Sequence, residues 1–381
     1  MLEEPLLSLC MIVKNEEVYL PQCLESVKDV VDEMIIVDTG STDNTPKIAA
    51  SYGASIHEYQ WQDDFAAARN FGLEKASGKY ILFLDADEEL SPQARSQLRS
   101  FLLNSDAEGI YLIVRSLSSA NALAPYYDSE QVRLFRNRPQ YRFENAIHEM
   151  IYPAILAHGG RLYKSRFVIH HYGYLKNVVQ GTETRIERDR RLLERMYREN
   201  PDSLYTKAKL GFIYLLERQY PNALQLLQEV AQGIDPKIVE PDFLHTVLVA
   251  LAQTAQATGN FKLSKECAKA GILLNTQPSL TRSSMFYYAT SSAAWVIDQI
   301  EQFAHDGNLR LSRAKLSKAF ESLKDELRES QSILEQLRSD CSENPQANEN
   351  LAIWQQKIAR AEQLIENISS LFSHQRENEG S

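Results

Sequence analysis

The 381-residue chain has only four cysteines, Cys10, Cys23, Cys267 and Cys341, and no CxxC pair. These cysteines lie far apart in the sequence, which fits a reducing compartment without a zinc site or a disulfide framework. No apolar run approaches the roughly 18 residues of a membrane span, and "MLEEPLLSLCMIVKNEE" has acids where a signal peptide needs a basic flank. We expect a cytoplasmic protein, with at most peripheral contact with a membrane.

Excess positive charge is also missing. The formal net charge is −10, which argues against binding to a nucleic-acid polymer, because such proteins carry a basic face. The stretch "RIERDRRLLERMYR" is one candidate basic patch. Its Glu–Arg spacing favours a solvated helix face with internal ion pairs instead.

Glycine-rich phosphate loops are absent, since neither GxGxxG nor GxxxxGK[ST] occurs anywhere in the chain. A bound phosphate would therefore need another source of positive charge. A divalent cation held by one or two carboxylates, with substrate phosphates completing its coordination, is the physical alternative.

The first half of the sequence alternates between strand-length apolar runs and stretches of helical periodicity. The runs are LLSLCMIV, EMIIVD, ASIHEY, KYILFLD and GIYLIVRS, and the helical stretches are Glu16–Lys28, Thr45–Tyr52, Phe65–Ala76 and Pro92–Leu103. Ser91 is the expected N-cap of the last helix. Apolar strands alternating with helices predict an α/β fold with a mostly parallel sheet.

From about Tyr126 the pattern changes to short aromatic strands, in VRLFRN, YRFENAIHEMIY and RFVIHHYGYL. These predict a mixed or antiparallel extension at one edge of the sheet. No further strands are expected after Leu175.

The second half is helical. Leu210-Gly211 with Tyr220, and Leu251-Ala252 with Phe261, recur some 41 residues apart at tetratricopeptide (TPR) spacing. An unrelated helical bundle is the alternative. Two later heptad patterns, Leu316 to Leu337 and Leu351 to Phe372, predict an antiparallel pair of helices. The predicted domains are residues 1–178 (α/β), 179–300 (TPR-like), 301–374 (helical hairpin) and a frayed tail at 375–381.

Polar residues follow three of the predicted parallel strands, in "VKNEE", "VDTGSTDNT" and "LDADEEL". Ligands of open α/β sheets bind at these carboxyl ends. The last segment is a DxD motif, in which Asp85 and Asp87 repel each other unless a positive charge lies between them or both are solvated.

Taken in order, "LSLCMIVKNEE", "EMIIVDTGSTDNT", "FAAARNFGLEKASGKYILFLDADEEL", and more loosely "VRLFRN", "FENAIHE" and "HHYGY", resemble the inverting family 2 glycosyltransferases of the GT-A fold. The match is close over residues 6–90 and looser to about 175. The resemblance implies a Rossmann-like sheet, a nucleotide-sugar donor, and Mn²⁺ or Mg²⁺.

The resemblance also implies donor-site roles. A uracil and ribose pocket would be lined by Met11, Val13, Asn15 and Glu16. Asp38 would accept from the base N3–H, Arg69 would reach the base or phosphates, and Asp85 would hold the ribose. Asp87 would bind the metal, with His171 as a late second ligand.

An inverting displacement also needs a general base. The best-known members place an ED pair and QxxRW in this region, and neither occurs here. Glu149 in "NAIHEMI" is the candidate base, and His148 the candidate substrate-positioning residue.

Structural explanations stay open for the same residues. Asp38 and Asp43 could build an Asx turn, Asp64 could cap the Phe65 helix, and His148 a strand. Glu149 could pair with an arginine, Arg142 or Arg166, and His171 could be a core histidine. Glu88 and Glu89 are expected to be solvated bystanders.

The leading hypothesis is a metal-dependent inverting glycosyltransferase that moves a sugar, from a UDP-sugar in the first instance, to a hydroxyl on a glycan, lipid or peptide. The helical repeats would present a surface to the acceptor or to a protein partner. A sugar nucleotidyltransferase is disfavoured because no glycine follows the first strand. The alternative from another class is a TPR-type interaction scaffold with a catalytically impaired GT-A domain.

Overall fold

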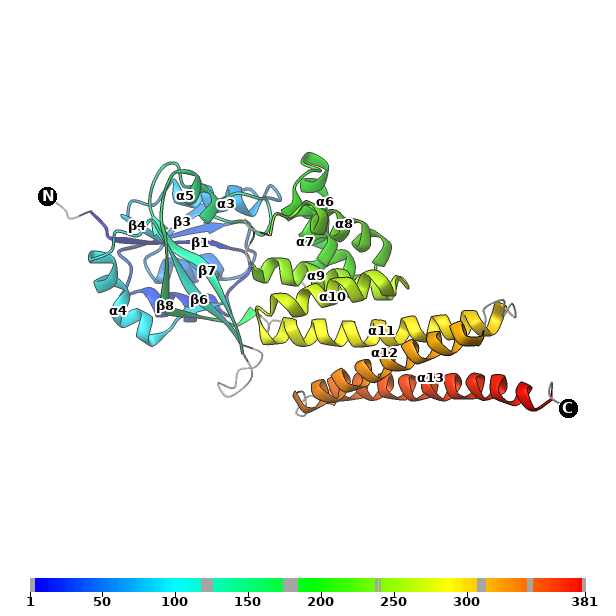
Figure 1. Ribbon diagram of the computed structural model, residues 1–381. Coiled ribbons are helices and arrows are strands. Elements are labelled where there is room, and N and C mark those ends of the chain that lie inside the picture. Colours follow the sequence, from blue (N-terminus) through cyan, green and yellow to red (C-terminus); the bar gives the residue numbers. More distant parts are fainter. Residues whose placement is uncertain are drawn as a thin grey trace. The chain divides into compact units, whose positions relative to one another are not determined.

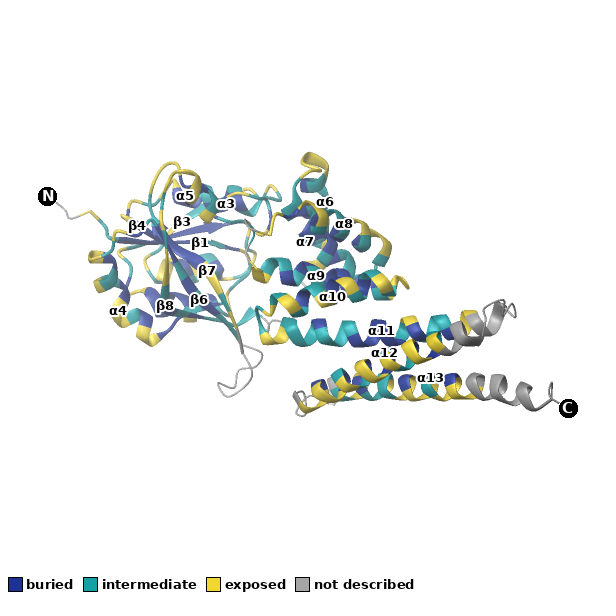
Figure 2. Cartoon of the chain, viewed as in Figure 1, coloured by how far each residue is buried: buried dark blue, intermediate teal, exposed yellow. Residues whose placement is uncertain are grey.

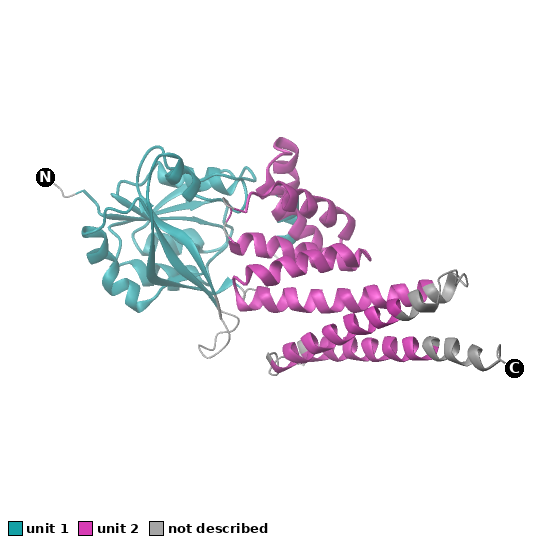
Figure 3. Cartoon of the chain, viewed as in Figure 1, with its two compact units in different colours: residues 1–192 teal, residues 193–381 magenta. Residues whose placement is uncertain are grey.

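A computed structural model describes residues 4–117, 126–173, 184–236, 239, 241–306, 313–340 and 345–378. The chain divides into two compact units, residues 1–192 and 193–381 (Figure 3).

The first unit contains one eight-stranded sheet with the order β3-β2-β1-β4-β7-β6-β8-β5 (Figure 1). Its strands are β1 (Leu7–Val13), β2 (Glu33–Asp38), β3 (Ser55–Glu58), β4 (Tyr80–Phe83), β5 (Glu88–Leu90), β6 (Gly109–Leu117), β7 (Tyr126–Arg136) and β8 (Leu162–His171). The first four strands in that order pair in parallel. This confirms the α/β prediction and brings the carboxyl ends of β1, β2 and β4 to one edge.

Helices cover both faces of this sheet. They are α1 (Leu20–Val27), α2 (Thr45–Ser51), α3 (Phe65–Leu73), α4 (Pro92–Leu103) and α5 (Tyr152–Ala157). The predicted caps are confirmed, because Ser91 accepts from the Ala94 N–H and Asp64 from the Ala67 N–H. Helix α1 begins later than predicted, since the Glu16 N–H donates to Thr45 Oγ1 at 2.7 Å and ties this segment to the β2–α2 connection.

The mixed extension of the sheet is also confirmed. Strand β7 pairs antiparallel with β4 and β6, β8 pairs parallel with β6, and β5 pairs antiparallel with β8. The predicted strand at 141–152 is wrong, because this segment holds one isolated bridge between Glu144 and Met150. Asn145 and His148 have φ of 73° and 54° there, values that a strand does not contain.

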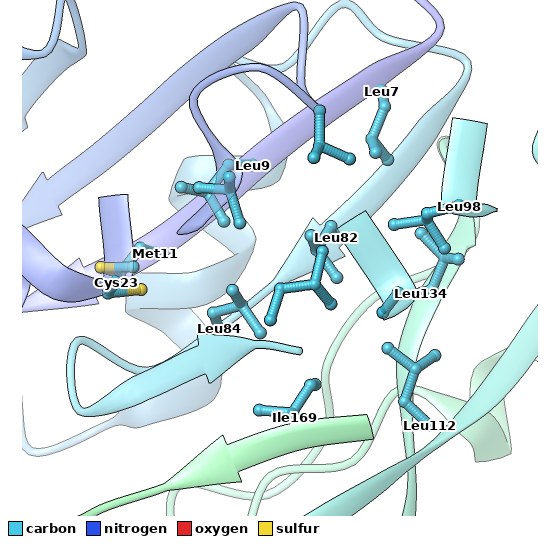
Figure 4. Close-up of a cluster of buried hydrophobic side chains, with 14 of the residues drawn as sticks. Leu7, Leu9, Met11, Cys23, Leu82, Leu84, Leu98, Leu112, Leu134 and Ile169 are labelled. Carbon is cyan, nitrogen blue, oxygen red and sulfur yellow. The ribbon is translucent and has the colours of Figure 1, made fainter. Parts of the chain in front are cut away.

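Two clusters of buried apolar side chains lie against the sheet, whose central strands are largely buried (Figure 2). One lies under α1 and α4 and includes Leu9, Leu82 and Leu134, which are in register on neighbouring strands and lie side by side in Figure 4. The other lies under α3 and α5 and includes Phe83, Phe135 and Phe143. Because both faces are covered, the strand ends are where polar side chains can gather.

The second unit is entirely helical over the residues that the structure describes. Its helices follow α6 (Arg185–Glu199), which crosses the boundary between the units, and are α7 (Leu204–Leu216), α8 (Tyr220–Gly233), α9 (Pro241–Ala257), α10 (Phe261–Leu274), α11 (Pro278–Asp306), α12 (Arg313–Asp340) and α13 (Pro345–Asn378). In the TPR-like pairs, a Cβ on Gly211 would lie 2.9 Å from Leu227, so the small residue permits close helix approach as predicted.

The predicted heptad positions whose side chains are described are buried, except Trp354, which is partly buried against the same cluster. Leu327, Leu334, Leu351 and Ile358 lie in one apolar cluster with residues of α11. Helix α11 therefore packs with the expected pair α12 and α13, and it crosses residue 300. The boundaries at 300 and 374 stay predictions. No helix in the described ranges has the length and hydropathy needed to cross a membrane.

Candidate active site

At the ends of β1 and β2, side chains bind the neighbouring backbone. Asn15, with φ of 56°, accepts from the Thr42 N–H at 2.7 Å, and its own N–H donates to Ser41 Oγ at 3.0 Å. Asp38 accepts from Ser41 Oγ at 2.5 Å and is 7% exposed. The structural role foreseen for Asp38 is therefore present, and its contact with a base stays a prediction.

The other residues foreseen for the nucleotide pocket lie beside this network. The Met11 and Val13 side chains belong to the apolar core, so only their backbone could face a nucleotide. Asp43 accepts from the Thr45 N–H at 2.9 Å and forms the expected Asx turn at the start of α2. It also accepts from the Glu17 N–H at 3.2 Å, which holds the ends of the two strands together.

Past the end of β4, five side chains of alternating charge form a continuous chain from Glu149 to Glu88. Arg69 donates from Nε to Glu149 at 2.6 Å and from a terminal nitrogen to Asp85 Oδ1 at 2.8 Å. Arg133 donates to Glu88 at 2.6 Å and approaches Asp85 Oδ2 at 3.4 Å. Asp85 thus has one arginine on each carboxylate oxygen.

The arginines are buried and share one aromatic ring. Arg69 is 7% exposed and Arg133 6%, and their guanidinium carbons lie 4.9 and 4.5 Å from the Phe83 ring centroid. Such stacking favours a cation over a π face. Arg69 is therefore not accessible to a base or phosphate. Its contacts indicate that it positions the carboxylates of Glu149 and Asp85, which it bridges.

This arrangement corrects the expectation for Glu88. The side chain is 1% exposed, pairs with Arg133 and accepts from the Asp85 N–H at 2.9 Å. Glu89 is not a solvated bystander either, since it binds Arg95, Gln22 Nε2 and Tyr172 OH. Asp85, Glu88 and Glu89 are thus each bonded to an arginine from another element of the fold.

Burial and neighbouring charge act in opposite directions on the pKa values of these acids. For Asp85, burial would raise the pKa, but Arg69 and Arg133 lower it well below the ordinary value, so the carboxylate is ionised. For Glu88, burial raises the pKa to about 7 although Arg133 opposes the shift, and the charge of Asp85 adds to it.

Asp87 and His171, the two predicted metal ligands, lie together. Asp87 Oδ2 is 3.7 Å from His171 Nε2, and Nδ1 of the same imidazole is 3.2 Å from Ser116 Oγ. A Cβ on Gly173 would collide with Nε2 of His171 and lie 3.0 Å from Asp87 Oδ2. The space beside the pair is therefore kept open by a glycine.

These two residues fit a divalent cation as part of a shared site. A carboxylate and an imidazole whose other nitrogen is hydrogen-bonded are a usual ligand combination. Within the described ranges no three or more His, Cys, Asp or Glu side chains are arranged to hold a metal ion without help. The pair suits a cation whose remaining ligands are substrate phosphates and water.

Glu149 pairs with Arg69, not with Arg142 or Arg166, and its side chain is 14% exposed. The sequence pointed to an arginine partner but not to the right one. His148 is exposed, with a positive φ that does not suit a strand end. Arg133 was missed altogether, although an arginine inside the apolar run "VRLF" was a signal that this strand position faces buried acids.

Comparison with known proteins assigns a family to part of the chain. Residues 8–170 match the description "Glycosyl transferase family 2". These residues form a glycosyl transferase family 2 domain. A TPR repeat-containing protein of Synechococcus elongatus is 40% identical over 66% of this chain and 62% of its own length.

Two more distant similarities accompany it. The SPbeta prophage-derived glycosyltransferase SunS of Bacillus subtilis is 26% identical over 53% of this chain and 47% of its own length. The crystal structure of S. aureus TarS aligns with a TM-score of 0.43 and 13% identity over 68% of this chain and 55% of that chain, which is too remote to support an inference about ligands. The chain spans less than two thirds of the length of these curated relatives. In this glycosyl transferase family 2 domain, the charged chain and the Asp87–His171 pair occupy the carboxyl edge of the sheet.

Proposed function

We propose that the chain is a metal-dependent inverting glycosyltransferase that moves a sugar from a nucleoside diphosphate donor, a UDP-sugar in the first instance, to an acceptor hydroxyl. The observation that carries the proposal is the juxtaposition of Asp87 and His171, 3.7 Å apart, with the ionised Asp85 at the end of β4. An ionised carboxylate can accept from both ribose hydroxyls. The neighbouring pair can hold the cation that neutralises the diphosphate.

The cation, when bound, stabilises the negative charge that develops on the departing diphosphate. Asp87 and His171 would hold it, with Ser116 fixing the imidazole through Nδ1. Asn15 and Asp38 would shape the base pocket at the ends of β1 and β2.

Glu149 is the proposed general base. The acceptor oxygen forms a bond to the anomeric carbon, the bond from that carbon to the diphosphate oxygen breaks, and the hydroxyl proton passes to the Glu149 carboxylate. Attack from the face opposite the leaving group inverts the anomeric centre. Arg69 holds Glu149 by one oxygen at 2.6 Å, which fixes its direction while the remaining lone pairs stay available.

The acceptor is proposed only as a hydroxyl on a glycan, lipid or peptide. The helical unit would bind this acceptor or a protein partner. A groove of about 510 Å³ along α8, lined among others by Leu224, Gln228 and Glu229, is one surface available for it. A cytoplasmic location, with peripheral membrane contact at most, stays a prediction from the sequence.

The test compares Asp87→Asn with a matched control, Asp106→Asn, whose carboxylate is 97% exposed. Purified protein is incubated with Mn²⁺ and single UDP- or GDP-sugars, and release of the nucleoside diphosphate is measured. We expect turnover in the unaltered chain and the control, and a loss of at least about 100-fold in Asp87→Asn. Turnover that survives Asp87→Asn would refute the metal assignment. Absence of binding and turnover with every donor would favour the scaffold alternative.

A further inference from the structure

Arg133 sits at an irregularity of the sheet. In the β6–β7 ladder, Ile110 pairs with Leu134 and Tyr111 pairs with Val132, so Arg133 is the extra residue of a β-bulge. Bulges re-aim single side chains and recur beside active sites. The bulge explains how an arginine flanked by buried Val132 and Leu134 reaches the acids beyond the end of β4.

The re-aimed guanidinium meets two carboxylates with different surroundings. Glu88 is 1% exposed and accepts hydrogen bonds from Arg133 and from the Asp85 N–H. These bonds stabilise the turn from Asp85 to Glu88. The Asp85 side chain is 36% exposed, so that solvent or a ligand can reach Asp85 but not Glu88. Arg133 therefore connects a buried anchor to a carboxylate that faces solvent.

We propose that Arg133, anchored by Glu88, is a positioning residue that fixes the Asp85 carboxylate for recognition of the donor's ribose hydroxyls. This inference rests on the proposed function. Arg69 restrains Asp85 Oδ1 from α3, and Arg133 restrains Oδ2 from β7. With both restraints the carboxylate cannot rotate, and its remaining lone pairs keep one direction. Without Arg133, one restraint is lost and ribose recognition weakens even though Asp85 itself is intact.

A competing explanation is that Arg133 only stabilises the fold. Removing one partner of a buried ion pair leaves an uncompensated charge, and this can unfold the domain. The variant Arg133→Met/Glu88→Gln avoids that outcome, because both charges are removed together and Gln keeps an acceptor for the Asp85 N–H.

Arg136→Met is the matched control. Arg136 lies on the same strand, its guanidinium carbon is 4.8 Å from the Tyr80 ring, and it donates to the Ser105 carbonyl at 3.0 Å. It is thus a half-buried, stacked arginine outside the charged chain, with a side chain that is 18% exposed. Thermal unfolding followed by circular dichroism verifies that both variants are folded.

The measurement is calorimetric binding of UDP and of 2′-deoxy-UDP in the presence of Mn²⁺. Hydrogen bonds to charged groups predict that the unaltered chain and Arg136→Met prefer UDP by about tenfold or more. In Arg133→Met/Glu88→Gln the preference should fall to about twofold or less, with UDP binding correspondingly weaker. A purely structural role would not change the ratio between the two nucleotides.

Retention of the full preference in the double variant would overturn the inference. Equal binding of both nucleotides by the unaltered chain would also overturn it, because Asp85 would then not read the ribose, while donor binding itself would stand. If the unaltered chain binds neither UDP nor GDP, the proposed function fails first, and the positioning role fails with it.

Discussion

Arg69→Met tests whether the charged chain stabilises the first unit. The substitution keeps an unbranched apolar stem but removes the cation that bridges Glu149 at 2.6 Å and Asp85 at 2.8 Å. Arg69 itself is buried, whereas the Asp85 side chain is 36% exposed and keeps Arg133 as a neighbour. The main loss is therefore at Glu149, which is 14% exposed.

The expected cost is about 3–5 kcal/mol in the free energy of unfolding, the usual range for breaking a buried pair. The double variant Arg69→Met/Glu149→Gln should recover about 1.5–3 kcal/mol of it, because no unpaired carboxylate remains. Lost stacking on Phe83, about 0.5–1 kcal/mol, stays lost in both variants.

Urea unfolding followed by tryptophan fluorescence measures these differences. Trp61 is the one tryptophan of the first unit, and its ring lies 4.7 Å from that of Phe65 on the same helix as Arg69. Trp295→Phe/Trp354→Phe provides a background in which Trp61 reports alone. A midpoint shift with an unchanged slope identifies a change in stability. A cost below about 1 kcal/mol, or no recovery in the double variant, would refute this reasoning.

Two further predictions follow from local geometry. Gly173→Ala should weaken Mn²⁺ binding in the presence of UDP by about tenfold or more, because the methyl group of the alanine would displace His171 from Asp87. The electron paramagnetic resonance signal of free Mn²⁺ measures the affinity, and an unchanged affinity would count against the site. Asp32 accepts from the Leu6 and Leu7 N–H groups and from Arg99, and although burial raises its pKa, these bonds bring the net pKa below the ordinary 3.8. A lowered folded-state pKa stabilises the protein above the ordinary value, and this contribution is lost as pH falls through the folded value. Asp32→Asn should therefore cost about 1 kcal/mol at pH 7 and progressively less below about pH 4 in urea titrations, whereas a pH-independent difference would contradict the assignment.

Local patterns were sufficient for the elements that are uniform along the chain. Three of the four parallel strands, β1, β2 and β4, were predicted because each is an apolar run buried on both faces. The fourth, β3, lies at the edge of the sheet and is exposed or half-buried along its length. The buried positions of α12 and α13 were predicted because the heptad spacing places the apolar residues of each helix on one face of that helix. Leu327 of α12 and Ile358 of α13 are examples. The segment at 141–152 failed because its aromatic residues suggested a strand, while positive φ at Asn145 and His148 excludes one.

The charged chain shows why the site itself resisted prediction. Asp85 and Glu88 lie three residues apart, yet the cations that balance them come from α3 and from the bulge of β7, the latter 45 or more residues away. A bulge has no signature in "QVRLFR", because it is defined by the partner strand. The repulsion within "LDADEEL" therefore does not need a metal to explain Asp85 and Glu88, which the fold compensates with two arginines. Asp87, which lies 3.7 Å from His171, stays the proposed metal ligand with His171 as its partner, as the resemblance implied, while the repulsion between Asp85 and Glu88 is balanced by the fold itself.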